Sequence, residues 1–422
     1  MALRAYQRRC KSLAAGRQTC RALRVADQPI ETMLQAARYY GAAALAESAA
    51  LRDSAAESDR AAAAFVHLAV LQTAAPAGTA RLAAIREALA LDPSSTRDAL
   101  WFFGDATVCS QLLHADEPAL RHLGVELAGR LTQAQFTDRV NALASDTPET
   151  VHLEAAARLG AFGAKAPTQC GDWLARGSIA RKLSALEVLC ITGTHVESAL
   201  LASVIEQAHG AAQDTDPAAV VAATAAVDRA FALWAVHAAD QALAAASKPA
   251  VAPDIALRVV ALIGSIRPLL AAWRTIAQQS EPLSTAQRDL IVLVLGKVPA
   301  ELALRPGAAE QRATALQALV FEVCRHNGCA DLKVEQLAGF DDNLLSGPLW
   351  PLDQIRLRRG RPWTRAATLE GALDVSHPLR RWLYAEHAAV SGIPFALCID
   401  DLASRQAQAL QALEDIRELL GA

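Results

Sequence analysis

Apolar positions recur at helical spacing along nearly the whole chain. One clear stripe starts at Leu120 and continues at i+3, i+7 and i+11, which places its members on one face of a helix. Val-rich runs at 259–263 and 291–295 lie inside longer windows with the same helical spacing. No alternating pattern bounded by hairpin turns stands out. The chain is therefore predicted to be all-α.

Proline marks the start of many of these helical segments. A proline fits the first turn of a helix, because the N–H that it lacks has no partner there. The turn clusters that interrupt the helical pattern are Asp92-Pro93, Glu117-Pro118, Thr147-Pro148, Asp216-Pro217, Ala252-Pro253, Glu281-Pro282 and Pro306-Gly307.

The chain also resembles itself at a spacing of 30 residues. When Pro118 is laid on Pro148, one column collects leucines and a second collects Val or Ala, and two arginines match two periods apart. These columns are Leu123, Leu153 and Leu183; Val125, Ala155 and Ala185; and Arg121 and Arg181. The segment from Pro253 to Arg258 repeats the opening of the segment at Pro118, and Arg258 lies 30 residues before Arg288.

Thirty residues accommodate two helices and two short turns, so each repeat is predicted to be an antiparallel helix pair. One pair cannot bury its own apolar faces, and stacking against the next pair would give an α-solenoid. An irregular Ala-rich helical domain is the alternative.

Three regions are predicted from the spacing. Residues 1–90 form an N-terminal helical region or cap, residues 91–330 carry the repeat array, and residues 331–422 form a loop-rich C-terminal segment with closing helices. The last helix is expected at about 404–420.

Composition supports helices packed at short range. The chain has 422 residues, of which 53% are hydrophobic and 5% aromatic, and alanine alone makes up about a fifth. The net charge of -3 argues against nucleic acid or anionic membrane as a partner of the whole molecule. The longest uncharged stretch, 61–80, contains His67, Gln72 and Pro76, so no membrane span is predicted.

The cysteines and the N-terminus bear on location. Eight cysteines without a Cys-x-x-Cys pair are typical of free thiols in a reducing compartment, and we expect a cytoplasmic protein. Seven basic and no acidic residues precede position 25, without the apolar core of a secretory signal. Leu3, Tyr6, Cys10 and Leu13 share one face there, which favours an amphipathic cap; an organellar transit peptide is the alternative.

The segment from Asp116 to Leu131 resembles short bacterial HEAT-like repeats, which open with an acidic residue and Pro followed by Leu-Arg. The whole layout resembles an uncharacterised family of bacterial HEAT-like repeat proteins whose genes tend to lie beside type VI secretion components. The Trp-Pro turn at 349–351, Trp363 and the segment 379–386 carry this second resemblance. The resemblance implies a solenoid and brings no catalytic residues with it.

The common catalytic motifs are missing from the sequence. It has no nucleophile elbow, P-loop, dinucleotide fingerprint or zincin motif, and Gly296-Lys297 is only a P-loop fragment. Cys324, His326 and Cys329 lie close enough for zinc, but no second pair follows them at finger spacing. His237, beside Trp234, is interpreted as a core residue. The sequence thus indicates no metal, no cofactor and no catalytic residue.

A cluster of arginines with an interleaved tryptophan is the candidate partner-binding site. Guanidinium groups can take carboxylate or phosphate in bidentate fashion, and an exposed Trp can anchor an interface. The alternative is that these arginines pair with Asp341, Asp342, Asp353 and nearby helix C-termini. The predicted partner-binding residues are Arg356, Arg358, Arg359, Arg361, Trp363 and Arg365.

Three functions follow as hypotheses. The first is a non-enzymatic protein-binding scaffold or adaptor, linked by the resemblance to type VI secretion assembly or effector loading. The second is a HEAT-like nucleic-acid-binding protein of the DNA-repair glycosylase type, although 34 basic and 44 acidic residues follow Arg24. The third is a HEAT-like lyase or chaperone for a small chromophore or cofactor. The sequence identifies neither the partner nor the oligomeric state.

Overall fold

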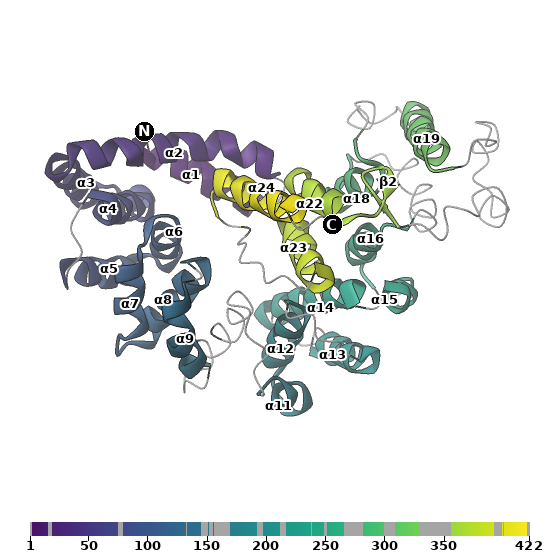
Figure 1. Cartoon of the computed structure of the whole chain (residues 1–422), viewed down its shortest axis with the longest axis horizontal. Coiled ribbons are helices and arrows are strands. Elements are labelled where there is room, and N and C mark those ends of the chain that lie inside the picture. Colours follow the sequence, from purple (N-terminus) through teal and green to yellow (C-terminus); the bar gives the residue numbers. More distant parts are fainter. Residues whose placement is uncertain are drawn as a thin grey trace. The chain divides into compact units, whose positions relative to one another are not determined.

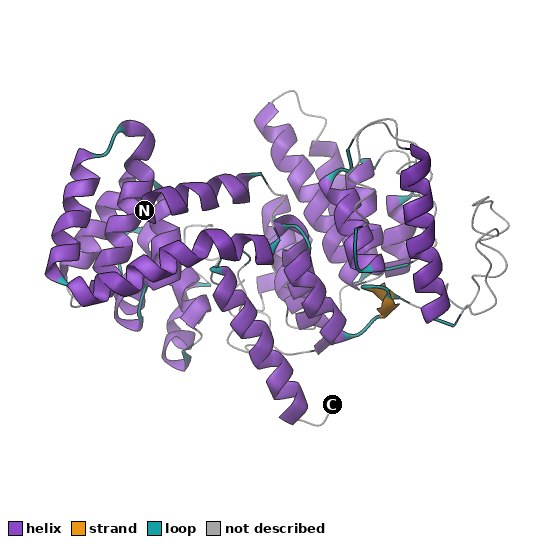
Figure 2. Ribbon diagram, turned by 90° about the horizontal axis from the view of Figure 1, so that it is seen from above, coloured by secondary structure: helices purple, strands orange, loops and turns teal. Residues whose placement is uncertain are grey.

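The computed structural model describes residues 2–15, 19–74, 79–131, 133–144, 151, 155, 169–191, 197–211, 217–237, 239–248, 251–265, 282–298, 309–328, 356–391, 399 and 401–419. These residues are almost entirely helical, which confirms the all-α prediction (Figure 2). The strands among them form one short hairpin. The chain divides into two compact units: unit 1 is Met1–Thr194 with Gly392–Ala422, and unit 2 is His195–Ser391.

Unit 1 contains the described α-helices up to residue 191 and the last helix of the chain (Figure 1). They are α1 (Ala2–Ala14), α2 (Cys20–Tyr40), α3 (Ala42–Ser54), α4 (Arg60–Ala74), α5 (Thr79–Leu91), α6 (Pro93–Phe103), α7 (Ala106–Leu113), α8 (Pro118–Leu131), α9 (Thr137–Leu143), α11 (Gln169–Arg176), α12 (Ile179–Ile191) and α24 (Ala403–Leu419), with 3-10 turns at Glu57–Asp59 and Ala134–Phe136.

Unit 2 contains the described helices between those segments and the hairpin. They are α13 (Ser198–Ala211), α14 (Pro217–His237), α15 (Ala239–Ala246), α16 (Pro253–Ile263), α18 (Thr285–Leu295), α19 (Ala309–His326), β1 (Leu357–Arg358), β2 (Arg361–Pro362), α22 (Arg365–Asp374) and α23 (His377–Ser391).

The two units divide the chain at other positions than residues 90 and 330. α4 packs on α6 and α6 on α8, so the core of unit 1 continues across residue 90. The C-terminal segment is divided, because α23 packs on α14 and α16 whereas α24 packs on α2. A helix belongs to the core that buries its apolar face, and the order of helices along the chain does not reveal which core that is.

Local sequence signals set many helix ends. Pro93, Pro118, Pro217 and Pro253 each begin a helix, as predicted. Pro282 instead precedes α18, which starts behind a capping box in which Ser284 and Gln287 bond each other's backbone. Pro148 and Pro306 lie outside the described residues.

The two apolar repeat columns lie in the core where they are described, whereas Arg121 and Arg181 are half-buried. Leu123 and Leu183 are buried, and Val125, Ala155 and Ala185 are fully buried; Leu153 lies outside the described residues. In unit 2, α14, α16 and α18 pack in sequence order. The HEAT-like array itself stays a prediction.

A buried ion pair joins α1 to α2 in unit 1, and its carboxylate also holds the start of α24. Arg9 on α1 is fully buried and donates from Nε to Asp27 Oδ1 at 2.7 Å. The other oxygen of Asp27 accepts the backbone N–H of Ala403, the first residue of α24, at 2.8 Å. Tyr6 on the same face of α1 stacks on Phe65 with ring centroids 3.7 Å apart. An ordered amphipathic cap is therefore present at the N-terminus.

Arginine side chains close several helix C-termini. The last carbonyls of a helix have no intrahelical donors and carry partial negative charge, which a guanidinium group satisfies with several N–H groups. In unit 1, Arg405 donates to the carbonyls of Trp101 and Phe102 at the end of α6, and Arg130 donates to that of Gly104 just beyond. Only six of the 41 basic residues are lysine, and the others are arginine. Capping helix C-termini gives some of these arginines a structural role.

Glycine ends α16, and its position allows a direct test. Gly264 has φ of +72°, and a Cβ placed there would collide with the Leu357 carbonyl oxygen. We expect Gly264→Ala to lower the free energy of unfolding of unit 2 by about 2 to 4 kcal/mol, the sum of left-handed strain and overpacking. Hydrogen exchange of unit 2 measures this loss.

Gly328→Ala is the matched control for that substitution. Gly328 also follows a helix with positive φ, +97°, but among the described residues, its chain neighbours aside, no heavy atom lies within 4 Å of the place that a Cβ would take. Gly328→Ala should therefore lower the free energy of unfolding only by the backbone strain, about 1 kcal/mol. Equal losses for the two variants would show that the close approach of Leu357 to Gly264 does not matter for stability.

Candidate functional site

A tight β-hairpin in unit 2 occupies the centre of the predicted arginine cluster. β1 and β2 pair antiparallel, with Arg358 opposite Arg361. The two turn residues, Arg359 and Gly360, have φ of +55° and +75°. Positive φ at both positions is the signature of a type I′ turn, which matches the twist of the strands. Leu357, fully buried, anchors the hairpin in the core.

The first strand of the hairpin closes the C-terminus of α16. The N–H of Leu357 donates to the carbonyl of Gly264 at 2.7 Å. Arg356 donates to the carbonyls of Ile263 and Leu262, and Arg358 donates to those of Ala261 and Leu262. Two guanidinium groups thus lie at the negative end of one helix.

Glu386 on α23 balances these two arginines. It forms ion pairs with Arg356 and with Arg358, the latter at 2.9 Å, and both Arg358 and Glu386 are almost wholly shielded from solvent. Burial by itself raises the pKa of Glu386, but the charges and hydrogen bonds of the two arginines outweigh burial and hold that pKa below its usual value. Burial lowers the pKa of Arg358, against the attraction of Glu386.

The turn of the hairpin meets two further helix ends. The N–H groups of Arg359 and Gly360 donate to Leu293 and Val294 in the last turn of α18, at 2.7 and 2.8 Å. Asn327, just past α19, donates from Nδ2 to the Gly360 carbonyl at 2.8 Å. The hairpin therefore gathers the C-termini of α16, α18 and α19 at one place.

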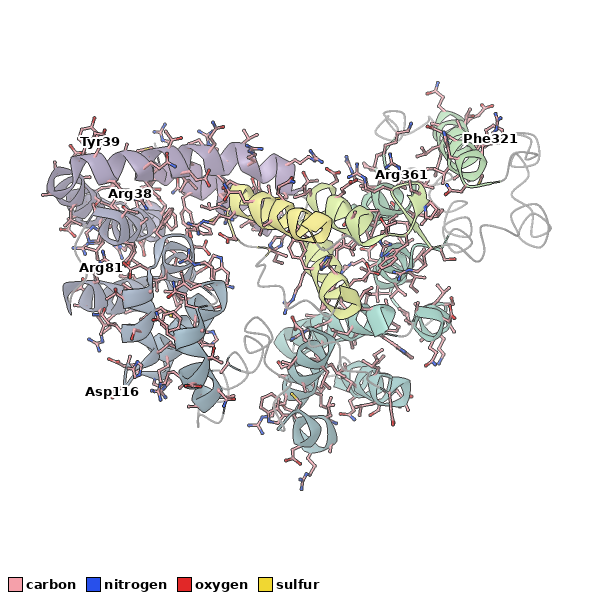
Figure 3. All side chains as sticks on the ribbon, viewed as in Figure 1. Arg38, Tyr39, Arg81, Asp116, Phe321 and Arg361 are labelled. Atoms are coloured by element: carbon pink, nitrogen blue, oxygen red, sulfur yellow. The ribbon has the colours of Figure 1, made fainter. Side chains whose placement is uncertain are left out.

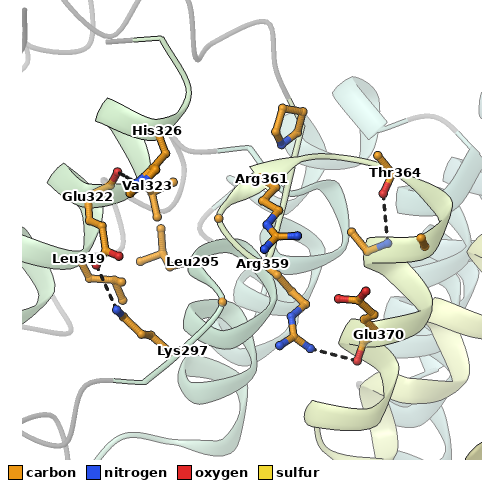
Figure 4. A pocket seen from close by; sticks show the side chains of 15 residues that line it. Leu295, Lys297, Leu319, Glu322, Val323, His326, Arg359, Arg361, Thr364 and Glu370 are labelled. Atoms are coloured by element: carbon orange, nitrogen blue, oxygen red, sulfur yellow. Dashed lines mark hydrogen bonds and ion pairs between the residues drawn. The ribbon is translucent and has the colours of Figure 1, made fainter. Parts of the chain in front are cut away.

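A cavity of about 690 Å³ lies where this turn, α19 and α22 meet (Figure 4). Figure 4 shows Leu319, Glu322, Val323 and His326 of α19 on one side, and Arg359, Arg361, Thr364 and Glu370 on the other. Leu295, Gly296, Lys297, Gly360, Pro362, Ala366 and Ala367 complete the lining. The volume is within the range of small-molecule and side-chain pockets, and the lining combines apolar and charged groups.

Some charges around this cavity are already matched. Lys297 Nζ lies 3.0 Å from Glu322 Oε2, and Arg359 forms an ion pair with Asp374. His326 bonds through Nδ1 to the Glu322 carbonyl. Arg361 is exposed, and within the part of the chain that the structure describes its side chain makes no hydrogen bond or ion pair.

The predicted partner-binding residues thus divide into two groups. Arg358 is fully buried and Arg356 is ion-paired and stacked over Trp363, 5.1 Å from its ring centroid, so these two serve the fold. Both donate to carbonyls at the C-terminal end of α16, which is the helix C-terminus part of the alternative interpretation. Partner binding by the cluster stays a prediction. Arg359 and Arg361 line the cavity, and Trp363 is half-buried.

For several residues of the predicted arginine site, the structure describes no side chain. The side chain of Arg365 is not described, although its backbone begins α22. Asp341, Asp342 and Asp353, offered as ion-pair partners of the arginines, lie outside the described residues. The partner that is described, Glu386, comes from a helix about 30 residues further on.

The metal and thiol candidates gain no support from the described geometry. Cys324 is fully buried whereas His326 is exposed, and Cys329 lies outside the described residues. Burial raises the pKa of the Cys109 thiol to about 12, so that thiol is held protonated. Trp234 is buried, as expected for the stretch containing His237, whose side chain is not described.

Sequence reasoning missed four residues at the cavity: Lys297, Glu322, His326 as a lining residue, and Glu370. The Arg359-Gly360 dipeptide was an available signal, since a glycine in a two-residue turn favours a hairpin. Gly296 after the apolar run at 291–295 likewise marks a helix end. Neither signal indicates that the two meet.

Comparison with known proteins adds no relative: no protein-family model, curated protein or solved structure matches the chain. None of the described helices is both long enough and apolar enough to cross a membrane.

The Glu386 carboxylate makes the stability of unit 2 depend on pH. Because its pKa is lower in the folded state than the usual 4.5, its charge stabilises the fold fully above that value, and the contribution is lost as the pH falls through the folded-state pKa. The stability difference between the chain and Glu386→Gln should be constant near neutral pH and shrink below about 4.5. Urea titrations between neutral and acidic pH measure it; a difference that grows on acidification contradicts this assignment.

Proposed function

We propose that this protein is a non-enzymatic scaffold or adaptor that binds a protein partner at the cavity between the hairpin, α19 and α22. The observation that carries the proposal is an exposed, unmatched arginine, Arg361, beside an apolar floor in a cavity of about 690 Å³. In protein interfaces, a few residues supply most of the binding energy. These residues include arginines and lie in or beside well-packed pockets.

The arrangement of helices in unit 2 supports a scaffold. α16 and α18 pack side by side and end at the same hairpin, which is the relation expected of equivalent helices in successive helix pairs. We propose on this basis that the chain contains a HEAT-like array, whose extended surfaces suit protein recognition. The link to type VI secretion assembly or effector loading is part of the proposal and rests on the sequence resemblance.

The mixed charge of the cavity favours a protein over nucleic acid. Glu322 and Glu370 line it together with the basic residues, and a phosphate backbone would approach both carboxylates. The same carboxylates count against a glycosylase-type protein that grips nucleic acid at this cavity.

Affinity capture tests the function. The tagged chain is used to capture proteins from native cell lysate at near-physiological salt, with and without nuclease, alongside Ala366→Trp, which fills the cavity. The control is Ala225→Trp, at an exposed position of α14 in the same unit. One or a few proteins should be recovered irrespective of nuclease, lost with Ala366→Trp and retained with Ala225→Trp.

Two results would contradict the proposal. Recovery of nucleic-acid proteins that disappears on nuclease treatment would favour the second hypothesis. Equal recovery by the two tryptophan variants would place the partner elsewhere on the chain.

A further inference from the structure

The cavity has an apolar half that suits an aliphatic or aromatic side chain. Leu295, Leu319 and Val323 contribute to its lining, and Pro362 and Gly360 of the hairpin lie beside them. The leucines and Val323 are fixed in the core, since each is at most 5% exposed, and each presents only the edge of its side chain to the cavity. A preformed apolar surface of this kind takes an apolar group without reorganisation, which lowers the entropic cost of binding.

The charged half of the cavity offers one unmatched cation among the described residues. Lys297 and Arg359 are each held by a carboxylate, of Glu322 and Asp374 respectively, so their charge is largely balanced. Arg361 is exposed and faces the cavity in Figure 4. A guanidinium group takes a carboxylate through two parallel hydrogen bonds, and Arg361 makes no such pair within the described part of the chain.

Glu370 limits what can bind beside Arg361. It is exposed, lines the same side of the cavity, and makes no ion pair within the described part of the chain (Figure 4). A polyanion such as a nucleic-acid strand would place several charges near this carboxylate and be repelled. A ligand with one carboxylate next to an apolar group brings a single negative charge, which Arg361 can balance, and so meets less of that repulsion.

We propose that the occupant of this cavity is a peptide segment of the partner protein in which an apolar side chain adjoins an aspartate or glutamate. The apolar side chain lies against Leu319 and Val323, and the carboxylate pairs with Arg361. This proposal rests on the proposed function, because it names the chemistry of the segment that an adaptor would bind there.

Selection from a displayed random 12-residue peptide library tests the proposal. The library is selected on the intact chain and counter-selected on Ala366→Trp. Peptides should be enriched in which an apolar residue adjoins Asp or Glu. Enrichment of sequences without an acidic residue, or no enrichment over the filled variant, would overturn the proposal.

Fluorescence anisotropy with one selected peptide then tests the contact with Arg361. Arg361→Glu should weaken binding about tenfold or more, through loss of one ion pair and gain of one repulsion. A peptide with Lys in place of its acidic residue should regain binding to Arg361→Glu. Arg288→Glu, at an exposed position on α18 near its opposite end, is the control and should bind as the intact chain does.

Other outcomes separate this proposal from the function itself. If Arg288→Glu weakens binding as much as Arg361→Glu, or if a 20-nucleotide single strand displaces the peptide, the assigned occupant is wrong. A partner captured in a cavity-dependent manner, together with peptides that lack the acidic residue, would leave the adaptor function standing and remove only this inference. If acidic peptides are selected but no partner protein is captured, the assigned peptide chemistry stands and the adaptor function is contradicted.

Discussion

Glu386→Gln is expected to lower the free energy of unfolding of unit 2 by about 3 to 5 kcal/mol. The substitution keeps the shape of the side chain and removes its charge, which leaves the fully buried guanidinium group of Arg358 without a counter-ion. Arg356 loses the same partner, but it is one-third exposed and water compensates it. The loss should therefore come mainly from Arg358.

Hydrogen exchange followed by mass spectrometry measures this loss, because it resolves peptides of unit 2 from those of unit 1. Amides in α16 and α23 should exchange faster in Glu386→Gln, and the most protected amides of unit 1 should not. Glu206→Gln, at an exposed position on α13, is the control and should change exchange little. Unchanged protection in α16 would show that the arginines do not depend on Glu386.

Asp27→Ala is expected to destabilise unit 1 by a similar amount, about 3 to 5 kcal/mol. The carboxylate accepts from buried Arg9 and from the first N–H of α24, so its removal leaves a buried cation and a free helix N-terminus. Amides of α24 should lose protection before the rest of unit 1, and a C-terminal fragment should become sensitive to protease. Glu47→Ala, on the exposed face of α3, is the control.

A double variant separates the charge from the packing. If the loss in Asp27→Ala comes from an uncompensated Arg9, then Arg9→Met combined with Asp27→Leu should restore much of the stability, because a buried ion pair can be replaced by apolar groups at little cost. A double variant that is as unstable as Asp27→Ala would show that the hydrogen bond to Ala403 carries most of the effect.

Two exposed tyrosines at the end of α2 form a second surface feature, but they do not indicate a particular ligand. Tyr39 and Tyr40, at the end of α2, are 95% and 70% exposed, and Figure 3 shows Tyr39 beside Arg38 at the surface of unit 1. No described group covers them, and their chemistry does not single out one occupant. The cavity in unit 2 differs because its lining combines apolar side chains with an exposed arginine.

The sequence predicted the local structure well where one residue controls the outcome. The first-turn prolines at 93, 118, 217 and 253 each begin a helix, and the last helix was expected within one residue of α24 at each end. Such signals act within one helical turn, so no knowledge of the packing is needed to interpret them.

The sequence failed where the outcome depends on contacts across many residues. The arginine cluster is typical of a surface, yet Arg358 is buried because Glu386 and the end of α16 surround it, 28 and 96 residues away. The tail was treated as one region, although its helices are buried by two separate cores. The cavity combines residues 295–297, 319–326 and 359–370, and no local pattern brings these segments together.

Site-specific photo-crosslinking tests most directly the claim that a partner binds at this cavity. A photoreactive phenylalanine analogue replaces Glu370, at the exposed rim of the cavity, and in a second variant replaces Glu206, an exposed helical glutamate elsewhere in unit 2. After irradiation of living cells, a covalent adduct with one protein should form from position 370 and not from position 206. Adducts at neither position, or the same adducts at both, would contradict the account.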